Sequence, residues 1–259
     1  MFLVRATVAR AVTRRSASPP ARAAAPAIAP QPTTLPVVPV TVLMAVAVVA
    51  LGALWAGVRT DGGLAFFDPF AVTWLAAHRP DWAVAGAAVV SDVGSPTTMS
   101  ALLVVVAAVV AWRRRSWGTA VAGGAGLGAV AGGDQLVKHL VARPRPPLAL
   151  HAVPADGFSF PSGHATLSAG VVLLVLWITW PVGDPGRHRD SVLAIAPRWV
   201  SITGAALIVV AVAGSRVVLG VHYPSDVLAG WCVAVLADGG VVLLVVAVRC
   251  CRPPQRGTP

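Results

Sequence analysis

Residues 37–58, VVPVTVLMAVAVVALGALWAGV, form an apolar run without a charged side chain. An α-helix rises about 1.5 Å per residue, so roughly 20 apolar residues are needed to cross the ~30 Å hydrocarbon core of a bilayer. The run therefore predicts a membrane-spanning helix, with lipid as the solvent around it.

Five further stretches have the length and apolar character of a span, and a shorter one suits a helix lying at the membrane surface. The chain is predicted to be all-α: a six-transmembrane-helix bundle with a short interfacial helix between the first two spans. The further spans are expected at 96–112, 117–140, 163–180, 198–214 and 224–248, and the interfacial helix at 82–92.

Three regions follow from this pattern: a six-span membrane domain over 37–248 and two tails. Residues 1–36 are rich in Ala, Arg and Pro and contain no acid, so we expect a disordered cytoplasmic tail or a segment before the true start. Residues 249–259 are expected to be a second cytoplasmic tail.

The composition supports a membrane protein. Hydrophobic residues make up 56% of the chain and charged residues 12%, against about 25% charged in a soluble domain. The net charge is +10, but the basic residues are scattered between apolar runs and form no stripe that could follow a nucleic-acid backbone. Nucleic acid is therefore excluded as a partner, and the sequence makes no prediction of oligomeric state.

Arginine placement predicts the orientation in the cell membrane. With six spans, the arginine-rich regions all fall on one side, which the positive-inside rule assigns to the cytoplasm. These regions are the N-terminal tail, residues 113–115, residues 187–198 and the C-terminal tail. Both termini are thus expected inside, and the remaining connections, 59–95, 141–162 and 215–223, outside.

Polar residues concentrate in three segments on that outer side: KHLVARPRP at 138–146, PSGH at 161–164 and SRVVLGVHYPSD at 215–226. The second segment opens a predicted helix. Free backbone N–H groups and the positive end of the helix dipole make such a start an anion site, and glycine lets an anion approach the backbone closely.

The other two segments supply a nucleophile and positive charge. His222 lies four residues before Asp226, whose carboxylate can bind one ring nitrogen and leave the other as a lone pair. Lys138, Arg145 and Arg216 add three cations, and guanidinium groups suit phosphoryl oxygens.

These segments resemble the type 2 phosphatidic acid phosphatase superfamily, whose signature is K-x6-R-P, then P-S-G-H, then S-R-x5-H-x3-D. Every fixed position matches, in order, and the resemblance covers about 37–248. It implies a nucleophile at His222 that forms a phosphohistidine, oriented by Asp226. It implies a general acid and base at His164, and no metal or cofactor. The phosphate-binding residues it implies are Lys138, Arg145, Arg216, Ser162 and Gly163.

The resemblance implies a metal-independent lipid phosphatase acting on a lipid phosphate or diphosphate. Candidate substrates are polyprenyl diphosphate, which we favour, phosphatidic acid and phosphatidylglycerol phosphate. A phosphotransferase using the same site, and a non-enzymatic membrane transporter, remain alternatives.

Four residues near the motifs carry separate expectations. Asp134 lies one helical turn before Lys138 and is predicted to orient or balance it. Arg143 could compete with Arg145 as the phosphate ligand, but the seven-residue offset from Lys138 selects Arg145, and Arg143 is expected to meet lipid headgroups. Tyr223 is left open between a substrate contact and helix packing, and Asp238, deep in the last predicted span, has no predicted partner.

Overall fold

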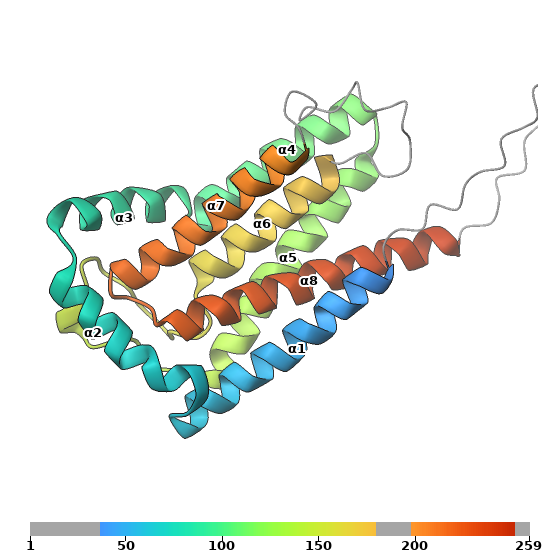
Figure 1. Ribbon diagram of the computed structural model, residues 1–259. Helices are drawn as coiled ribbons and strands as arrows, with labels where there is room; N and C mark the ends of the chain where they lie inside the picture. Colours follow the sequence, from blue (N-terminus) through green and yellow to red (C-terminus); the bar gives the residue numbers. More distant parts are fainter. Residues whose placement is uncertain (1–36, 180–197, 252–259) are drawn as a thin grey trace, which may run out of the picture. The chain divides into compact units, whose positions relative to one another are not determined.

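The computed structural model describes residues 37–179 and 198–251, and the tail predicted over 1–36 lies outside them (Figure 1). In this part of the chain all regular structure is helical. The elements are α1 (Val37–Thr60), η1 (Gly63–Phe67), α2 (Asp68–His78), α3 (Asp81–Val93), α4 (Pro96–Arg114), α5 (Trp117–Val141), η2 (Leu148–Leu150), α6 (Gly163–Thr179), α7 (Arg198–Val218) and α8 (Pro224–Cys250).

Within the described residues a helix is present at each of the six predicted spans, and four of these helices are long and apolar enough to cross a membrane: α1, α4, α7 from Trp199, and α8 up to Val248. Helix α6 is apolar but shorter, with 17 described residues. Helix α5 has 25 residues, but glycines and the polar group around Asp134 lower its hydropathy. The structure thus shows a helical membrane protein with four clear candidate spans.

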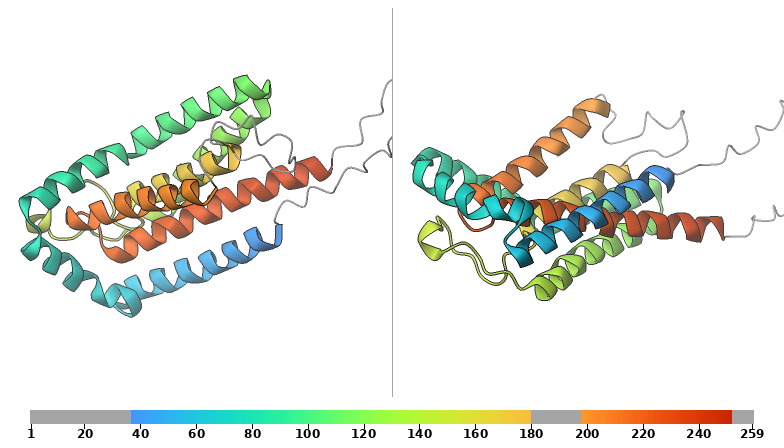
Figure 2. Two further views of the ribbon diagram at one scale, coloured as in Figure 1. Left: turned by 45° about the horizontal axis from the view of Figure 1, so that its top comes forward. Right: turned by 60° about the horizontal axis from the view of Figure 1, so that its bottom comes forward.

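Helix α6 is the central element of the bundle, and it packs against α4, α5, α7 and α8 (Figures 1 and 2). Helix α8 packs also against α1 and α5, α4 against α5, and α7 against α3. Helices α5 and α6 approach closely where Gly126 faces Leu174 and Gly170 faces Val130. A Cβ added at Gly126 would lie 2.5 Å from the Leu174 side chain, and one added at Gly170 would lie 2.7 Å from the Val130 side chain. Small residues at a helix crossing allow this approach.

The segment between α1 and α4 differs from the prediction of one helix at 82–92. That helix is present as α3, but η1 and α2 precede it. Pro69 suits the first turn of α2, and the Arg79–Pro80 pair separates α2 from α3, because the residue before a proline disfavours helical backbone.

Helix α7 was predicted to end at 214 but continues to Val218, so Ser215 and Arg216 are helical rather than part of a loop. The apolar residues after Gly214 contain no helix breaker until Gly220, whose φ of +73° turns the chain. Helix α8 was predicted to end at 248 and continues to Cys250, and residues 252–259 of the predicted C-terminal tail lie outside the described residues.

Candidate active site

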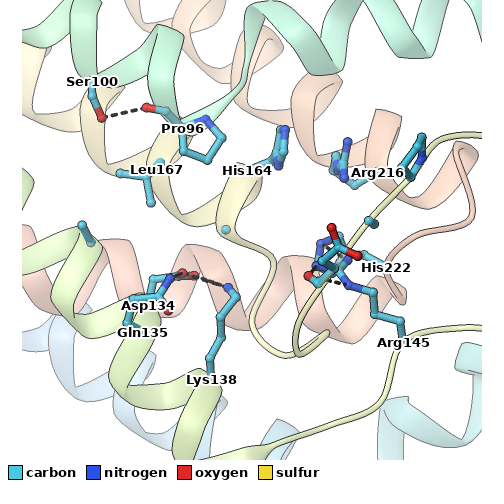
Figure 3. Close-up of a pocket in the computed structure, with 15 residues that line it drawn as sticks. Pro96, Ser100, Asp134, Gln135, Lys138, Arg145, His164, Leu167, Arg216 and His222 are labelled. Atoms are coloured by element: carbon cyan, nitrogen blue, oxygen red, sulfur yellow. Dashed lines mark hydrogen bonds and ion pairs between the residues drawn. The ribbon is translucent and has the colours of Figure 1, made fainter.

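A cavity of about 440 Å³ lies where α5, α6 and α7 meet the connection between α5 and α6 and the loop between α7 and α8 (Figure 3). Pro96 and Ser100 of α4 and Asp156 of the connection between α5 and α6 also line it. Six of the eight residues predicted for the site line this one cavity: Lys138, Arg145, Gly163, His164, Arg216 and His222. Three segments far apart in sequence are thus brought around one space large enough for a phosphoryl group.

His222 lies in the short loop between α7 and α8 and is 2% exposed. Its Nε2 lies 3.0 Å from NH1 of Arg145. Because a guanidinium can only donate, Nε2 must be the acceptor, and the ring proton is assigned to Nδ1. Nδ1 points toward Asp226, 3.4 Å from Oδ2, which is longer than a well-formed hydrogen bond. The lone pair therefore lies on the nitrogen beside the cavity.

His222 is neutral at pH 7. Burial lowers the pKa of His222 to about 4, outweighing the opposing effect of the Asp226 carboxylate, while Arg145 and Arg216 lower it further. A neutral imidazole is the form in which histidine can attack phosphorus.

Asp226 stands behind His222 in the first turn of α8 and is fully buried. Its Oδ1 accepts a hydrogen bond from Arg143 NH1 at 2.7 Å. Its Oδ2 accepts bonds from the Ser159 hydroxyl and from the backbone N–H of Tyr223, the latter at 2.8 Å. These contacts fix the carboxylate, with Oδ2 directed to the histidine.

Arg145 is held by backbone carbonyls as well as by His222. NH1 donates to Val221 O and NH2 to Asp156 O, both at 2.8 Å, while Nε approaches Asp156 O and Gly157 O. Burial lowers the pKa of Arg145, although an arginine remains charged at pH 7. The guanidinium is therefore fixed beside the nitrogen that carries the lone pair.

Lys138 forms an ion pair with Asp134, which confirms the predicted pairing. Its Nζ lies 2.9 Å and 2.8 Å from the two carboxylate oxygens and 2.7 Å from the carbonyl of Pro161. An ammonium has three protons, so all its donors are engaged. An anion in the cavity would have to replace one of these acceptors.

Helix α6 begins at Gly163, so its N-terminus faces the cavity through Gly163 and His164. Ser162 is fully buried, its N–H donates to Asp226 O at 2.9 Å, and its hydroxyl has no partner among the described residues. Arg216 of α7 lies beside His164 in Figure 3, and its NH1 donates to the Ser91 hydroxyl of α3. Gly163, His164 and Arg216 line the cavity, whereas the predicted site residues Ser162 and Asp226 lie behind its lining.

Sequence reasoning missed the contacts that fix Asp226. Arg143 is 11% exposed at its side chain and pairs with Asp226 and Asp68, so the expected headgroup role is wrong. Its guanidinium carbon lies 4.1 Å from the centre of the Tyr223 ring, a cation–π contact, and Tyr223 does not line the cavity. Arg143 and Asp68 are 75 residues apart, so no local sequence pattern indicates their pairing. The Arg-Pro-Arg-Pro repeat showed only that two arginines, Arg143 and Arg145, were candidates for binding phosphate.

Asp238 remains without a partner. It is 6% exposed in α8, and neither carboxylate oxygen has a hydrogen-bond partner within the described part of the chain.

The profile described as "PAP2 superfamily" matches residues 117–250, which is more than half of the chain. The chain belongs to the PAP2 superfamily. In this PAP2 protein the matched region runs from the start of α5 to the end of α8, and it contains all eight residues predicted for the site.

Characterised relatives are similar to parts of this PAP2 protein. Phosphatidylglycerophosphatase B of Escherichia coli (strain K12) is 36% identical over 99 residues, 38% of this chain and 32% of that protein. Decaprenylphosphoryl-5-phosphoribose phosphatase of Mycobacterium tuberculosis (strain H37Rv) is 37% identical over 51% of this chain and 61% of its own length. Undecaprenyl-diphosphatase of Sulfolobus acidocaldarius is 38% identical over 33% of this chain and 32% of its own length. The chain thus spans about a third to three fifths of these relatives.

A solved structure shows the same fold. The crystal structure of a transmembrane PAP2 type phosphatidylglycerolphosphate phosphatase from Bacillus subtilis aligns with a TM-score of 0.62 and 21% identity. The alignment covers 82% of this chain and 98% of that one, so the helical membrane fold is shared over nearly all of the solved chain.

Proposed function

We propose that this protein is a metal-independent membrane phosphatase that hydrolyses a lipid phosphate or diphosphate through a phosphohistidine at His222. The observation that carries the proposal is the setting of that imidazole. Nε2 accepts from Arg145 beside a cavity also lined by Lys138 and Arg216, while Nδ1 points to Asp226.

In the first step, Nε2 of His222 attacks phosphorus and the bond from phosphorus to the leaving oxygen breaks. Arg145 moves from Nε2 to a phosphoryl oxygen as the new bond forms. His164 enters the step protonated, a form that the bound phosphate anion favours, and it donates this proton to the leaving oxygen. Asp226 stabilises the charge that develops on the imidazole of His222. The cations and the Gly163 amide stabilise the phosphoryl oxygens, as in phosphoryl transfer generally.

In the second step, water attacks the phosphorus of the phosphohistidine. His164, now neutral, accepts the proton of that water, and the Nε2–phosphorus bond breaks with its electron pair returning to nitrogen. Phosphate leaves, and both histidines are back in their starting protonation states.

The proposal places this chemistry on the extracytoplasmic side of a six-span protein with both termini in the cytoplasm. Helix α4 supports this orientation, because Pro96 at its start lines the cavity and Arg113 and Arg114 lie in its last turn. Its 19 residues make the helix about 28 Å long, close to the thickness of the hydrocarbon core.

Among substrates we favour a polyprenyl diphosphate, with phosphatidic acid and phosphatidylglycerol phosphate as the other candidates. The names of the Sulfolobus, Mycobacterium and Escherichia relatives include prenyl and glycerophospholipid phosphatases, and a lipid substrate suits a cavity set among membrane helices. The cavity's cations would bind the phosphate of any of them.

Phosphate release from these three lipids by the purified protein tests the proposal, with His222→Gln as the paired variant. We expect release from at least one lipid without an alcohol acceptor, undiminished by EDTA and abolished in the variant. Release only with an added alcohol would indicate a phosphotransferase. A strict divalent-metal requirement, or no release from any lipid, would reject the proposal.

A further inference from the structure

A buried carboxylate outside the signature motifs is connected to the site. Asp68, the first residue of α2, is 1% exposed although it lies in the outer segment between α1 and α4. Its Oδ1 accepts from the backbone N–H of Ser225 at 3.1 Å, and its Oδ2 from the Ser225 hydroxyl and from Arg143 NH2, the latter at 2.8 Å. Three hydrogen-bond donors thus reach this buried carboxylate and fix its orientation.

Arg143 bridges this acid to Asp226. NH2 binds Asp68, while NH1 binds Oδ1 of Asp226 at 2.7 Å and the Ser225 hydroxyl at 2.8 Å. The carboxylates of Asp68 and Asp226 raise the pKa of Arg143 overall, although burial, the largest single effect, lowers it. The guanidinium is thus shared between acids from two different helices.

Sharing changes how Arg143 can bind Asp226. A guanidinium facing one carboxylate favours a bidentate pair, in which it engages both oxygens. Here Asp68 occupies NH2, so only NH1 reaches Asp226, and it binds Oδ1. Oδ2 of Asp226 is left to Ser159, the Tyr223 amide and the Nδ1 of His222.

We infer that Asp68 and Arg143 are positioning residues for the reaction: Asp68 holds one arm of Arg143 so that the other fixes Oδ1 of Asp226 and leaves Oδ2 facing His222. The inference rests on the proposed function, in which His222 is the nucleophile. It adds α2 to the machinery of the site, although α2 lies outside the region matched by the family profile.

Asp68→Asn tests the inference, because it keeps the shape of the side chain and removes the charge that holds Arg143. In purified protein acting on a lipid that the wild type hydrolyses, we expect kcat to fall about 10- to 100-fold, the range known for outer partners that orient metal ligands. KM and the inhibition constant of inorganic phosphate should not change, since the cavity's cations are untouched. Asp81→Asn, an exposed acid in the first turn of α3, is the matched control and should keep wild-type kcat.

Arg143→Lys is the second variant, because it keeps the charge but its single ammonium cannot bridge the two acids as the guanidinium does. We expect a loss of kcat similar to that of Asp68→Asn. In the double variant the loss should be much smaller than the product of the two single losses, as for residues in one network.

Wild-type kcat in Asp68→Asn or Arg143→Lys would overturn the inference. A loss of kcat in the double variant equal to the product of the two single losses would overturn it as well, because it would show that the two residues act independently. A matched rise in KM and in the phosphate inhibition constant would also overturn it, since that pattern indicates a general disturbance of the site. If Asp68→Asn fails to fold, Arg143→Lys decides alone. Absence of wild-type turnover would instead reject the proposed function.

Discussion

At the scale of single residues, the proposed chemistry depends on which nitrogen of His222 carries the proton. Arg145 can only donate to Nε2, and the Asp226 carboxylate lies toward Nδ1. The motif positions could be predicted from sequence, because the proposed chemistry needs each of these residue types. The contacts of Ser159, Arg143 and Asp68 could not be predicted, because each joins residues at least 67 positions apart in the sequence. Ser159 and Arg143 bind Asp226 directly, and Asp68 acts on it through Arg143.

The depressed pKa of His222 predicts a pH dependence of stability. The pKa is about 4 in the folded protein and 6.5 for an ordinary histidine, so the unfolded state binds the extra proton between these values. The free energy of unfolding should therefore fall as pH drops from 6.5 to 4, by roughly 3 kcal/mol from this residue. We expect the melting temperature in detergent to fall less steeply over that window in His222→Gln than in the wild type. Parallel curves would show that this imidazole is not held neutral.

The ion pair between Asp134 and Lys138 predicts a second residue-scale effect. Asp134→Asn leaves a largely buried ammonium without its counter-charge, which costs on the order of 3 kcal/mol. We expect a lower melting temperature and a lower kcat/KM, because Lys138 loses its orientation. Asp61→Asn is the control, an exposed acid with a positive φ that asparagine tolerates. Full activity and normal abundance of Asp134→Asn would contradict the role of the pair.

At the scale of elements, apolar runs predicted the helices of the bundle to within a few residues. Helix ends were predicted less well where the deciding contact is tertiary. The loop after α7 is an example: Arg79, from the break between α2 and α3, donates from NH1 to Val218 O at 2.5 Å and from NH2 to Leu150 O at 2.8 Å. The sequence around Gly220 could not show that a distant arginine and η2 close over this turn.

Gly220→Ala should disrupt the turn that presents His222. The φ of Gly220 is +73°, and an added Cβ would lie 2.1 Å from Leu150 O and 3.1 Å from Arg79 NH1. The backbone conformation alone costs about 1–2 kcal/mol for a residue with a Cβ. We expect a lower melting temperature and a large loss of kcat.

Gly214→Ala is the matched control, because Gly214 lies in α7, the helix that precedes the turn, and its added Cβ would meet nothing within 4 Å. Alanine is the better helix former, by up to about 1 kcal/mol, so this variant should be as stable as the wild type or more so. Equal effects of the two substitutions would contradict the account of the turn.

At the scale of the whole molecule, the shared fold and the family follow from features that the sequence already carries. Long apolar runs make the helices, and the three motifs bring their residues to one cavity. The additional helix α2 was not predicted, because its residues mix aromatic and polar types and its buried acid looks like a surface residue in sequence. The orientation in the membrane remains a prediction from arginine placement.

Single cysteines test that orientation in cells. With Cys232, Cys250 and Cys251 replaced by serine, Asp81→Cys should react with a membrane-impermeant maleimide added to intact cells. Arg113→Cys should react only after the membrane is permeabilised. Both positions are exposed in the structure, so the reverse pattern of labelling would place the site on the cytoplasmic face.

The central claim is a covalent bond between phosphorus and His222. The direct measurement is rapid alkaline quenching of the enzyme during turnover of a substrate carrying ³²P in its terminal phosphate, followed by peptide mapping. The account predicts an alkali-stable, acid-labile label on the peptide containing His222, with label and turnover both absent in His222→Gln. A label on another residue, or turnover retained by His222→Gln, would contradict it.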